Sequence, residues 1–277
     1  MRTKASYAFT ALALLALIGC ASGPVRSGDQ APPVGPAPKV ILGVFGGMGP
    51  EATANFYQLV VALTPATRDQ EHIPTLIYSL PQVPDRTAAI RSGDPSIVPY
   101  LVEGVTRLEK AGASFIAIPC NTAHYYLEPM RKAVNIPILD MIGAAAEEVA
   151  RSHPTAKRVG LLATSGTIGT GLYHRAFAAR AIEVVTPDQA AQEQLVMKAV
   201  YTIKAGTNKR EAEELLFRAG RELEAGGADV IVLGCTEIPL AFNAARSGVP
   251  VVNATRVLAE RAIQTYRDLV AAAAPGK

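Results

Sequence analysis

The sequence predicts an α/β fold of two pseudo-symmetric α/β lobes with mainly parallel sheets and the functional site in the cleft between them. Apolar runs rich in branched residues alternate with helical patterns, which is typical of parallel sheets covered on both faces. In addition, residues 108–122 (LEKAGASFIAIPCNT) align with residues 223–237 (LEAGGADVIVLGCTE) at a constant offset of 115 residues. A repeat of this length suits a duplicated small domain rather than a solenoid unit.

The repeat extends upstream of this match. Three residues of the first half recur in order at an offset of 117 residues, so that Gly43, Gly49 and Thr53 correspond to Gly160, Gly166 and Thr170. We therefore expect two related lobes, residues 39–157 and residues 158–277, with a final helix that can pack back on the first lobe.

The first residues are expected to be a targeting segment rather than part of the fold. Residues 1–19 contain Arg2, Lys4 and an apolar run that is too short to span a bilayer. The run ends in Leu-Ile-Gly-Cys, which resembles a bacterial lipobox, so we expect lipidation of Cys20; an ordinary cleaved signal peptide is the alternative. Residues 20–38, rich in Gly, Pro, Ser and Ala, are predicted to be a tether.

These features predict an exported, periplasmic protein that a lipid anchor holds at the cell envelope without spanning it. Ala21 after the lipidated cysteine favours the outer membrane if the source is Gram-negative. The formal charge of the whole chain is +3, and Arg2 and Lys4 lie in the predicted leader. With no tryptophan and few aromatic residues either, the chain gives no argument for nucleic-acid binding.

The first lobe is predicted to begin with the buried strand 39–45, which leads through a Gly-rich turn into a helix over residues 52–63. The strand 74–79 follows. A helix over residues 99–112 ends at glycine, as is typical of a helix C-terminus. The strand that ends at Cys120 comes next, and a short strand at "PIL" feeds the last helix.

The second lobe is predicted to repeat this order. The strand 157–163 leads through a Gly/Thr turn into a helix over residues 171–181, and a helix over residues 210–227 again ends at glycine. The strand that ends at Cys235 and a short strand at "PVV" follow. Ligands of parallel sheets bind outside the carboxyl ends of the strands, where both cysteines are expected to lie.

Two facing thiols suit the inversion of a carbon centre without a cofactor. The reference pKa of a thiol is about 8.5, and nearby donors or helix N-termini lower it. If Cys120 and Cys235 flank one carbon, a thiolate takes its proton from one face and a thiol protonates the other.

Each half of the sequence also contains groups that can bind a carboxylate. The turns at residues 46–49 and 164–167 can offer backbone N–H groups at helix N-termini. Arg86 and Lys204 stand 118 residues apart and so occupy nearly equivalent places in the two halves. Two cations suit a substrate with two carboxylates and stabilise a carbanion next to one. The residues predicted to contact the substrate are Met48, Gly49, Arg86, Asn121, Thr122, Ala123, Thr164, Lys204, Thr236 and Glu237.

Six ordered motifs between about residues 39 and 262 carry a family resemblance: GGMGPEAT, PQVPDRT, PCNTAHY, LLAT-GTI, IKAG and LGCTEIPL. The chain resembles the aspartate/glutamate racemase family, most closely its aspartate racemase branch. The resemblance implies a cofactor-independent racemase, often dimeric, that acts on aspartate, with glutamate or a broader set as further substrates. By this resemblance, the catalytic pair is Cys120 and Cys235, the cations for the substrate carboxylates are Arg86 and Lys204, and the carboxylate-binding pair is Asn121 and Thr122.

Other interpretations of these residues remain open. Cys120 and Cys235 could be inert buried thiols or form a disulfide, and Cys120 with His124 could begin a zinc site that lacks clear further ligands. Arg86 and Lys204 could be surface charges. Glu237 could bind substrate, tune the Cys235 thiol or cap a helix.

Cofactor motifs in the sequence are weak. Residues 47–52 fit a loose dinucleotide pattern, but the next strand offers no acid for a ribose. Nothing beyond Lys204 favours pyridoxal phosphate, and no metal is predicted. The alternatives to an aspartate racemase are a hydantoin racemase, a maleate isomerase-like enzyme and a periplasmic amino-acid-binding lipoprotein.

Overall fold

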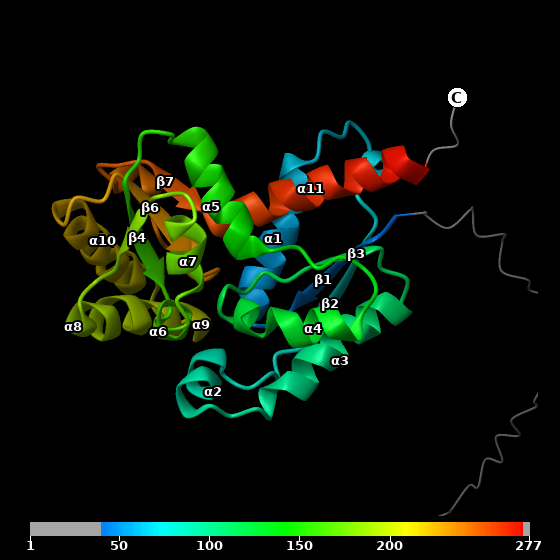
Figure 1. Cartoon of the computed structure of the whole chain (residues 1–277), viewed down its shortest axis with the longest axis horizontal. Coiled ribbons are helices and arrows are strands. Elements are labelled where there is room, and N and C mark those ends of the chain that lie inside the picture. Colours follow the sequence, from blue (N-terminus) through cyan, green and yellow to red (C-terminus); the bar gives the residue numbers. More distant parts are fainter. Residues whose placement is uncertain (1–39, 274–277) are drawn as a thin grey trace, which may run out of the picture. The chain divides into compact units, whose positions relative to one another are not determined.

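The computed structural model describes residues 40–273, which belong to one compact unit. The predicted leader, the lipidation site at Cys20 and the tether lie outside the described residues. Both sheets of the described chain are parallel, so the predicted α/β fold is confirmed (Figure 1). Within the described residues, no helix is both long and apolar enough to cross a bilayer.

The first sheet has the strand order β2–β1–β3. Its elements, in chain order, are β1 (Leu42–Gly46), α1 (Pro50–Leu63), η1 (Asp69–Glu71), β2 (Thr75–Ser79), α2 (Arg86–Ser92), α3 (Ile97–Lys110), β3 (Phe115–Ala117), η2 (Thr122–Tyr126), α4 (Leu127–Ala133) and α5 (Met141–Ser152). The strand predicted at "PIL" is reduced to a single bridge between Ile116 and Ile138. Directly after this bridge the chain turns into α5, whose first turn Asp140 caps through the N–H groups of Ile142 and Gly143.

The second sheet has the order β5–β4–β6–β7, which repeats the order of the first sheet and its bridge. Its elements are β4 (Arg158–Ala163), α6 (Ser165–Gly169), α7 (Leu172–Ala178), β5 (Glu183–Val185), α8 (Gln189–Ala191), the π-helix η3 (Gln192–Met197), α9 (Lys198–Lys204), α10 (Lys209–Ala225), β6 (Val230–Gly234), η4 (Ile238–Leu240), η5 (Ala244–Arg246), β7 (Val251–Asn253) and α11 (Ala254–Ala273). The helix predicted over residues 171–181 is shorter at both ends. Gly171 lies before its first turn in a left-handed conformation (φ 66°), and the chain leaves the helix after Ala178, with Ala181 also at a positive φ (56°).

Alternating side chains of the strands divide the interior into layers. In β1, Leu42 points into a core shared by both halves, whereas Phe45 points into an outer core that includes residues of α3 and α4. In β6, Val232 joins the shared core, whereas Leu233 joins an outer core with residues of α9 and α10. Each sheet is therefore buried on both faces, as its uninterrupted apolar strands predict.

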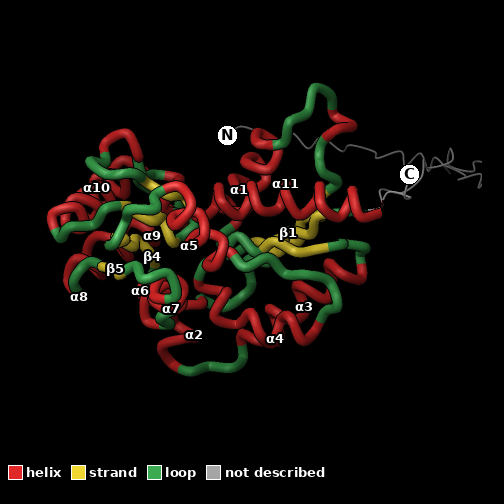
Figure 2. The backbone as a smooth tube through the Cα atoms, turned by 45° about the horizontal axis from the view of Figure 1, so that its top comes forward, coloured by secondary structure: helices red, strands yellow, loops and turns green. Residues whose placement is uncertain are grey.

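The last helix of each half packs against elements of the other half. Helix α5 contacts α7 and β7, and helix α11 contacts α1 as well as α5 (Figure 2). The shared core contains residues of both sheets and both of these helices. The packing of each last helix on the opposite half joins the two lobes into one unit. It also fixes how the carboxyl ends of the strands in the two sheets face each other.

One packing detail recurs at equivalent places in both halves. A Cβ atom at Gly43 would lie 2.9 Å from the Cβ of Ala113, and one at Gly160 would lie 3.0 Å from the Cβ of Ala228. At both places the central strand passes close to the alanine two residues before the cysteine strand, so a larger side chain would require its neighbours to shift. The repeat in the sequence thus includes a steric requirement of the fold.

Candidate active site

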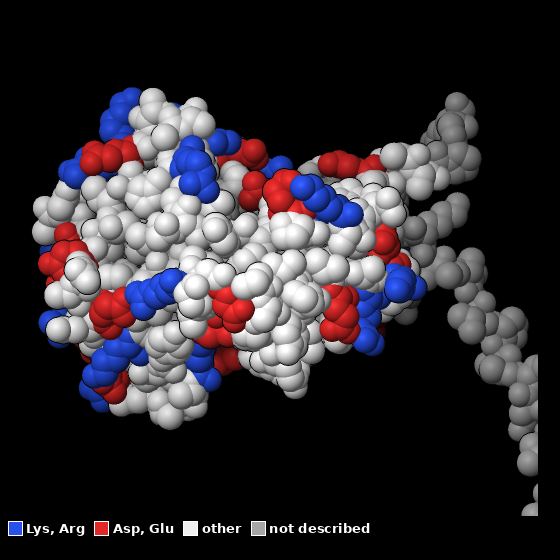
Figure 3. Space-filling view, turned by 60° about the horizontal axis from the view of Figure 1, so that its bottom comes forward, with Lys and Arg blue, Asp and Glu red and all other residues white. Residues whose placement is uncertain are grey.

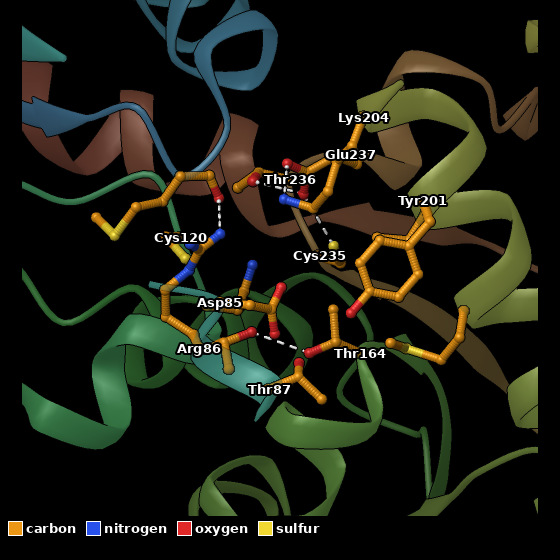
Figure 4. A pocket seen from close by; sticks show the side chains of 15 residues that line it. Asp85, Arg86, Thr87, Cys120, Thr164, Tyr201, Lys204, Cys235, Thr236 and Glu237 are labelled. Atoms are coloured by element: carbon orange, nitrogen blue, oxygen red, sulfur yellow. Dashed lines mark hydrogen bonds and ion pairs between the residues drawn. The ribbon is translucent and has the colours of Figure 1, made fainter. Parts of the chain in front are cut away.

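A pocket at the carboxyl ends of both sheets brings the two cysteines together. It is lined by Met48, Asp85, Arg86, Thr87, Cys120, Asn121, Thr122, Thr164, Met197, Val200, Tyr201, Lys204, Cys235, Thr236 and Glu237. Figure 4 shows Cys120 on the same side as Arg86, with Cys235, Glu237 and Lys204 on the other. The free space is only about 20 Å³, which is room for a water molecule rather than an amino acid.

Cys120 and Cys235 are both free thiols, and each is 5% exposed. Cys120 lies just beyond β3 and Cys235 directly follows β6, the two equivalent strands of the repeat. The structure holds no disulfide between them, and both line a pocket rather than being enclosed by apolar side chains alone. Their placement fits a chemical role better than a structural one.

Glu237 connects the Cys235 thiol to two other groups. The thiol donates to Oε2 of Glu237 at 3.1 Å, while Oε1 accepts from Nζ of Lys204 at 2.8 Å and from the backbone N–H of Gly49 at 3.0 Å. Burial and the Glu237 carboxylate raise the pKa of Cys235, against a smaller lowering by Lys204. Cys235 is thus held in its protonated form.

Lys204 is not a free cation in this arrangement. Burial lowers its pKa, but Glu237 and then Cys235 outweigh burial, so that the net pKa is raised and the ammonium persists. Its charge is balanced by the carboxylate it binds. Although Glu237 precedes η4, it makes no side-chain capping bond, so the capping alternative does not describe it.

The backbone N–H group of Gly49 already has a partner within the protein. Its N–H group at the start of α1 does bind a carboxylate, but that carboxylate belongs to Glu237. A Cβ at Gly49 would lie 3.1 Å from Oε1 of Glu237, so glycine suits this close approach. Gly49 therefore supports Glu237 and does not line the inner pocket.

Arg86 is held at the pocket by the backbone. Nη1 donates to the carbonyls of Val83 (3.1 Å) and Pro84 (3.0 Å), and Nη2 donates to the carbonyl of Met48 (3.2 Å). Three of the five guanidinium N–H groups are thus used, and two remain for a ligand. The adjacent Asp85 caps α2 by accepting from Ala88 N–H, which fixes the start of the helix that carries Arg86.

Of the residues that follow Cys120, Asn121 lies at the pocket, whereas Ala123 lies in the core. Asn121 is 2% exposed, and its Oδ1 accepts from the Tyr173 hydroxyl at 2.7 Å. Among the described residues, its Nδ2 has no hydrogen-bond partner, which leaves a buried donor at the pocket. Ala123, predicted to contact the substrate, instead packs in the first outer core and does not line the pocket, because the turn η2 directs it inward.

His124 supports Cys120 rather than binding the pocket. Its Nε2 accepts from Met141 N–H at 3.1 Å, so Nδ1 carries the proton and donates to the Cys120 carbonyl at 2.9 Å. Burial lowers the pKa of His124, which keeps the ring neutral. Both ring nitrogens are occupied, and the described part of the chain has no group of three or more His, Cys, Asp or Glu placed to hold a metal ion.

Three buried threonines join the lobes beside the pocket. The hydroxyl of Thr122 lies 2.9 Å from those of Thr164 and Thr167, which lie 3.0 Å from each other. Thr164 also caps α6 through Thr167 N–H. Thr122 and Thr164 thus line the pocket and hold the two lobes in register.

Replacing Thr167 with valine is expected to lower the unfolding free energy by about 1 kcal/mol, because the hydroxyl loses its contact with Thr122 across the lobes and its contact with Thr164 within the second lobe. For a chain of this size, the melting temperature should fall by about 2–4 °C. Thr255→Val is the matched control, because the hydroxyl of Thr255 is buried without a partner among the described residues. Calorimetry should show no loss for that control; equal losses would contradict the bridging role.

Five pocket residues were not predicted from the sequence: Asp85, Thr87, Met197, Val200 and Tyr201. The spacing of one helix face relates Lys204 to Met197, Val200 and Tyr201. The prediction of Lys204 as a site residue could therefore have indicated these three as further pocket residues. Burial and the charge of Asp85 raise the pKa of Tyr201, whose hydroxyl remains protonated.

Comparison with known proteins supports the resemblance seen in the sequence. The family model described as Asp/Glu/Hydantoin racemase matches residues 45–262. The broad specificity amino-acid racemase RacX of Bacillus subtilis is 29% identical over 230 residues, which cover 82% of this chain and 98% of RacX. The Picrophilus torridus aspartate racemase structure has a TM-score of 0.74 and 30% identity, covering 82% of this chain and 94% of its own.

A second solved structure, a putative Asp/Glu racemase from Yersinia pestis, has a TM-score of 0.68 and 28% identity over 82% of this chain and 99% of its own. The glutamate racemase of Francisella tularensis, solved with D-glutamate, has a TM-score of 0.61 at 17% identity and shares the fold. The family match spans most of the chain and includes both cysteines. The chain therefore belongs to the Asp/Glu/Hydantoin racemase family.

Proposed function

We propose that this chain is an amino-acid racemase that works without pyridoxal phosphate or metal and uses Cys120 and Cys235 as its two acid–base groups. The observation that carries the proposal is that two free, buried thiols at equivalent strand ends line one pocket. Aspartate is the first substrate to test, since Arg86 offers a cation and a structural relative is an aspartate racemase. Glutamate follows, and the RacX relative supports a broader range.

The proposed reaction moves one proton in and one proton out. One cysteine, as thiolate, takes the α-proton and becomes a thiol, while the other thiol protonates the opposite face and becomes a thiolate. The hydrogen bond from Cys235 to Glu237 supports starting with Cys235 as the acid and Cys120 as the base. The remaining N–H groups of Arg86 and the free Nδ2 of Asn121 would hold the α-carboxylate, where the charge of the carbanion develops.

Deuterium exchange tests the proposal. In D₂O without added cofactor, both L- and D-aspartate should acquire deuterium at the α-carbon and converge to equal amounts of the two hands. An amino-acid-binding protein would leave the α-proton in place. If no amino acid were turned over, α-proton exchange of a hydantoin would instead favour a hydantoin racemase. Conversion of maleate would favour a maleate isomerase-like enzyme.

The charge distribution does not suggest a polyanionic partner. On the face shown in Figure 3, positive and negative side chains are interspersed rather than gathered in one basic patch. With a formal charge of +3 for the whole sequence, this pattern agrees with a small-molecule substrate.

Arg86→Ala is expected to raise KM about tenfold, the effect of losing one charge-assisted hydrogen bond to the substrate carboxylate. The lower positive charge should also reduce kcat, because Arg86 would stabilise the carbanion. Steady-state kinetics with both enantiomers would measure these effects. A melting curve would show whether the variant stays folded without the bond from Arg86 to the Met48 carbonyl. Unchanged kinetics would remove Arg86 from the proposed site.

We further propose that residues 1–19 direct export and that Cys20 carries the lipid. Cys20→Ser should move the protein from the membrane fraction to the soluble fraction and abolish labelling with radioactive palmitate. Labelling that persists in the variant would contradict lipidation at this position. Homodimer formation remains a separate proposal, which sedimentation of the purified chain would test.

A further inference from the structure

A larger space that is partly open to solvent, the outer chamber, lies directly beside the inner pocket. Its free volume is about 310 Å³, against about 20 Å³ for the inner pocket. The two spaces share four residues as a common wall: Asp85, Arg86, Lys204 and Glu237. A molecule whose α-carbon lies between the thiols therefore has space for a bulky group on the far side of this wall.

The common wall carries two positive and two negative groups. Lys204 binds Glu237 at 2.8 Å, so this cation is already balanced. Arg86 binds backbone carbonyls, and its neighbour Asp85 caps α2, so Arg86 is the one cation of this wall without a carboxylate partner among the described residues. Arg86 and Lys204 are thus not both available to bind the two carboxylates of an acidic amino acid. Strict selection of acidic side chains needs two available cations, or a barrier against neutral side chains.

The outer chamber offers an apolar lining beyond this wall. Pro50, Pro81, Val83, Ile203 and Leu240 supply it. The remaining charged residue of the lining, Glu51, is paired with Lys209. Apolar surface next to a balanced wall favours the burial of a neutral aliphatic side chain.

We infer that the enzyme also racemises amino acids with long, neutral, apolar side chains, such as leucine and methionine, and that the outer chamber holds these side chains. The inference rests on the proposed racemase function and defines its substrate class. The α-carboxylate and α-carbon would occupy the inner pocket for every substrate, while the side chain would extend between Arg86 and Lys204 once the wall opens.

The test compares α-deuteration of aspartate, leucine and methionine by the unmodified enzyme and two variants. Leu240→Trp fills the outer chamber. Leu269→Trp is the control, because Leu269 is equally half-buried but lies on α11, which lines neither space. Leu240→Trp should lower kcat/KM for leucine relative to aspartate by about tenfold or more, whereas Leu269→Trp should leave this ratio unchanged.

Each outcome separates the chamber from the racemase function. Turnover of aspartate without turnover of leucine or methionine would overturn this inference and leave the racemase proposal standing. Equal effects of the two variants on the ratio would overturn the assignment of the chamber. If no amino acid exchanged its α-proton, both proposals would fail.

Discussion

Replacing Cys120 or Cys235 with serine is expected to lower kcat for racemisation by about 10²–10⁴-fold, the usual effect of losing a general acid or base. A serine hydroxyl is far less acidic than a thiol, so it supplies neither the base nor an acid of matched strength. Serine at position 235 can still donate to Glu237, and both positions are buried, so the shape of the pocket is preserved. Chiral chromatography of aspartate over time would measure the loss.

The two single variants should also differ from each other. If each cysteine acts on one face, the variant that retains the base for one enantiomer can still exchange its α-proton with solvent but cannot invert the centre. Proton NMR in D₂O, started separately from L- and D-aspartate, would show exchange confined to opposite enantiomers in the two variants. Nearly full racemisation by either variant would rule out the two-thiol mechanism, provided that its melting curve shows a folded protein.

Much of the fold could be predicted because the relevant forces act locally along the chain. The buried strands are continuous apolar segments, and the Cys120 and Cys235 strand ends repeat at a fixed offset. In each lobe a parallel sheet brings its strand ends to one edge, and two related lobes can face each other across a cleft at those edges, which is why two distant cysteines could be expected near one pocket. The comparisons then confirmed the family that the motifs indicated.

The sequence could not show how charges and helices pair in space. Lys204 and Glu237 are 33 residues apart, and nothing in the local pattern says that Glu237 would neutralise Lys204 and occupy the N–H group of Gly49. The burial of Ala123 depends on the geometry of η2, which a Cys-Asn-Thr-Ala pattern does not specify. The packing of α5 and α11 on opposite halves likewise depends on tertiary contacts rather than on propensity.

Glu237→Gln is expected to change both stability and the pH dependence of the reaction. The substitution leaves Lys204, whose side chain is 24% exposed, without its carboxylate partner. An unpaired ammonium at this depth should lower the unfolding free energy by about 3 kcal/mol. The pKa of Lys204 should fall, because burial lowers it and Glu237 no longer opposes burial.

The pKa of Cys235 should also fall in this variant. Burial still raises it, but the carboxylate that adds to the rise is gone, while Lys204 still lowers it wherever that lysine remains protonated. When Cys235 acts as base, its rate grows as pH rises through this pKa; when it acts as acid, its rate declines there. In the pH profile of kcat/KM, the rising limb for the enantiomer that Cys235 deprotonates should therefore move to lower pH. The falling limb for the other enantiomer, where Cys235 acts as the acid, should move to lower pH as well.

Glu193→Gln is the matched control for this change. Glu193 also pairs with a cation, Arg91 at 2.5 Å, but that pair is exposed and neither residue lines the pocket. Exposed pairs contribute little to stability, so the control should unfold almost as the unmodified protein does, with both pH limbs in place. If Glu237→Gln left the limbs unmoved while Cys235 was still required for turnover, the hydrogen bond between the Cys235 thiol and Glu237 would not control the proton that the reaction uses.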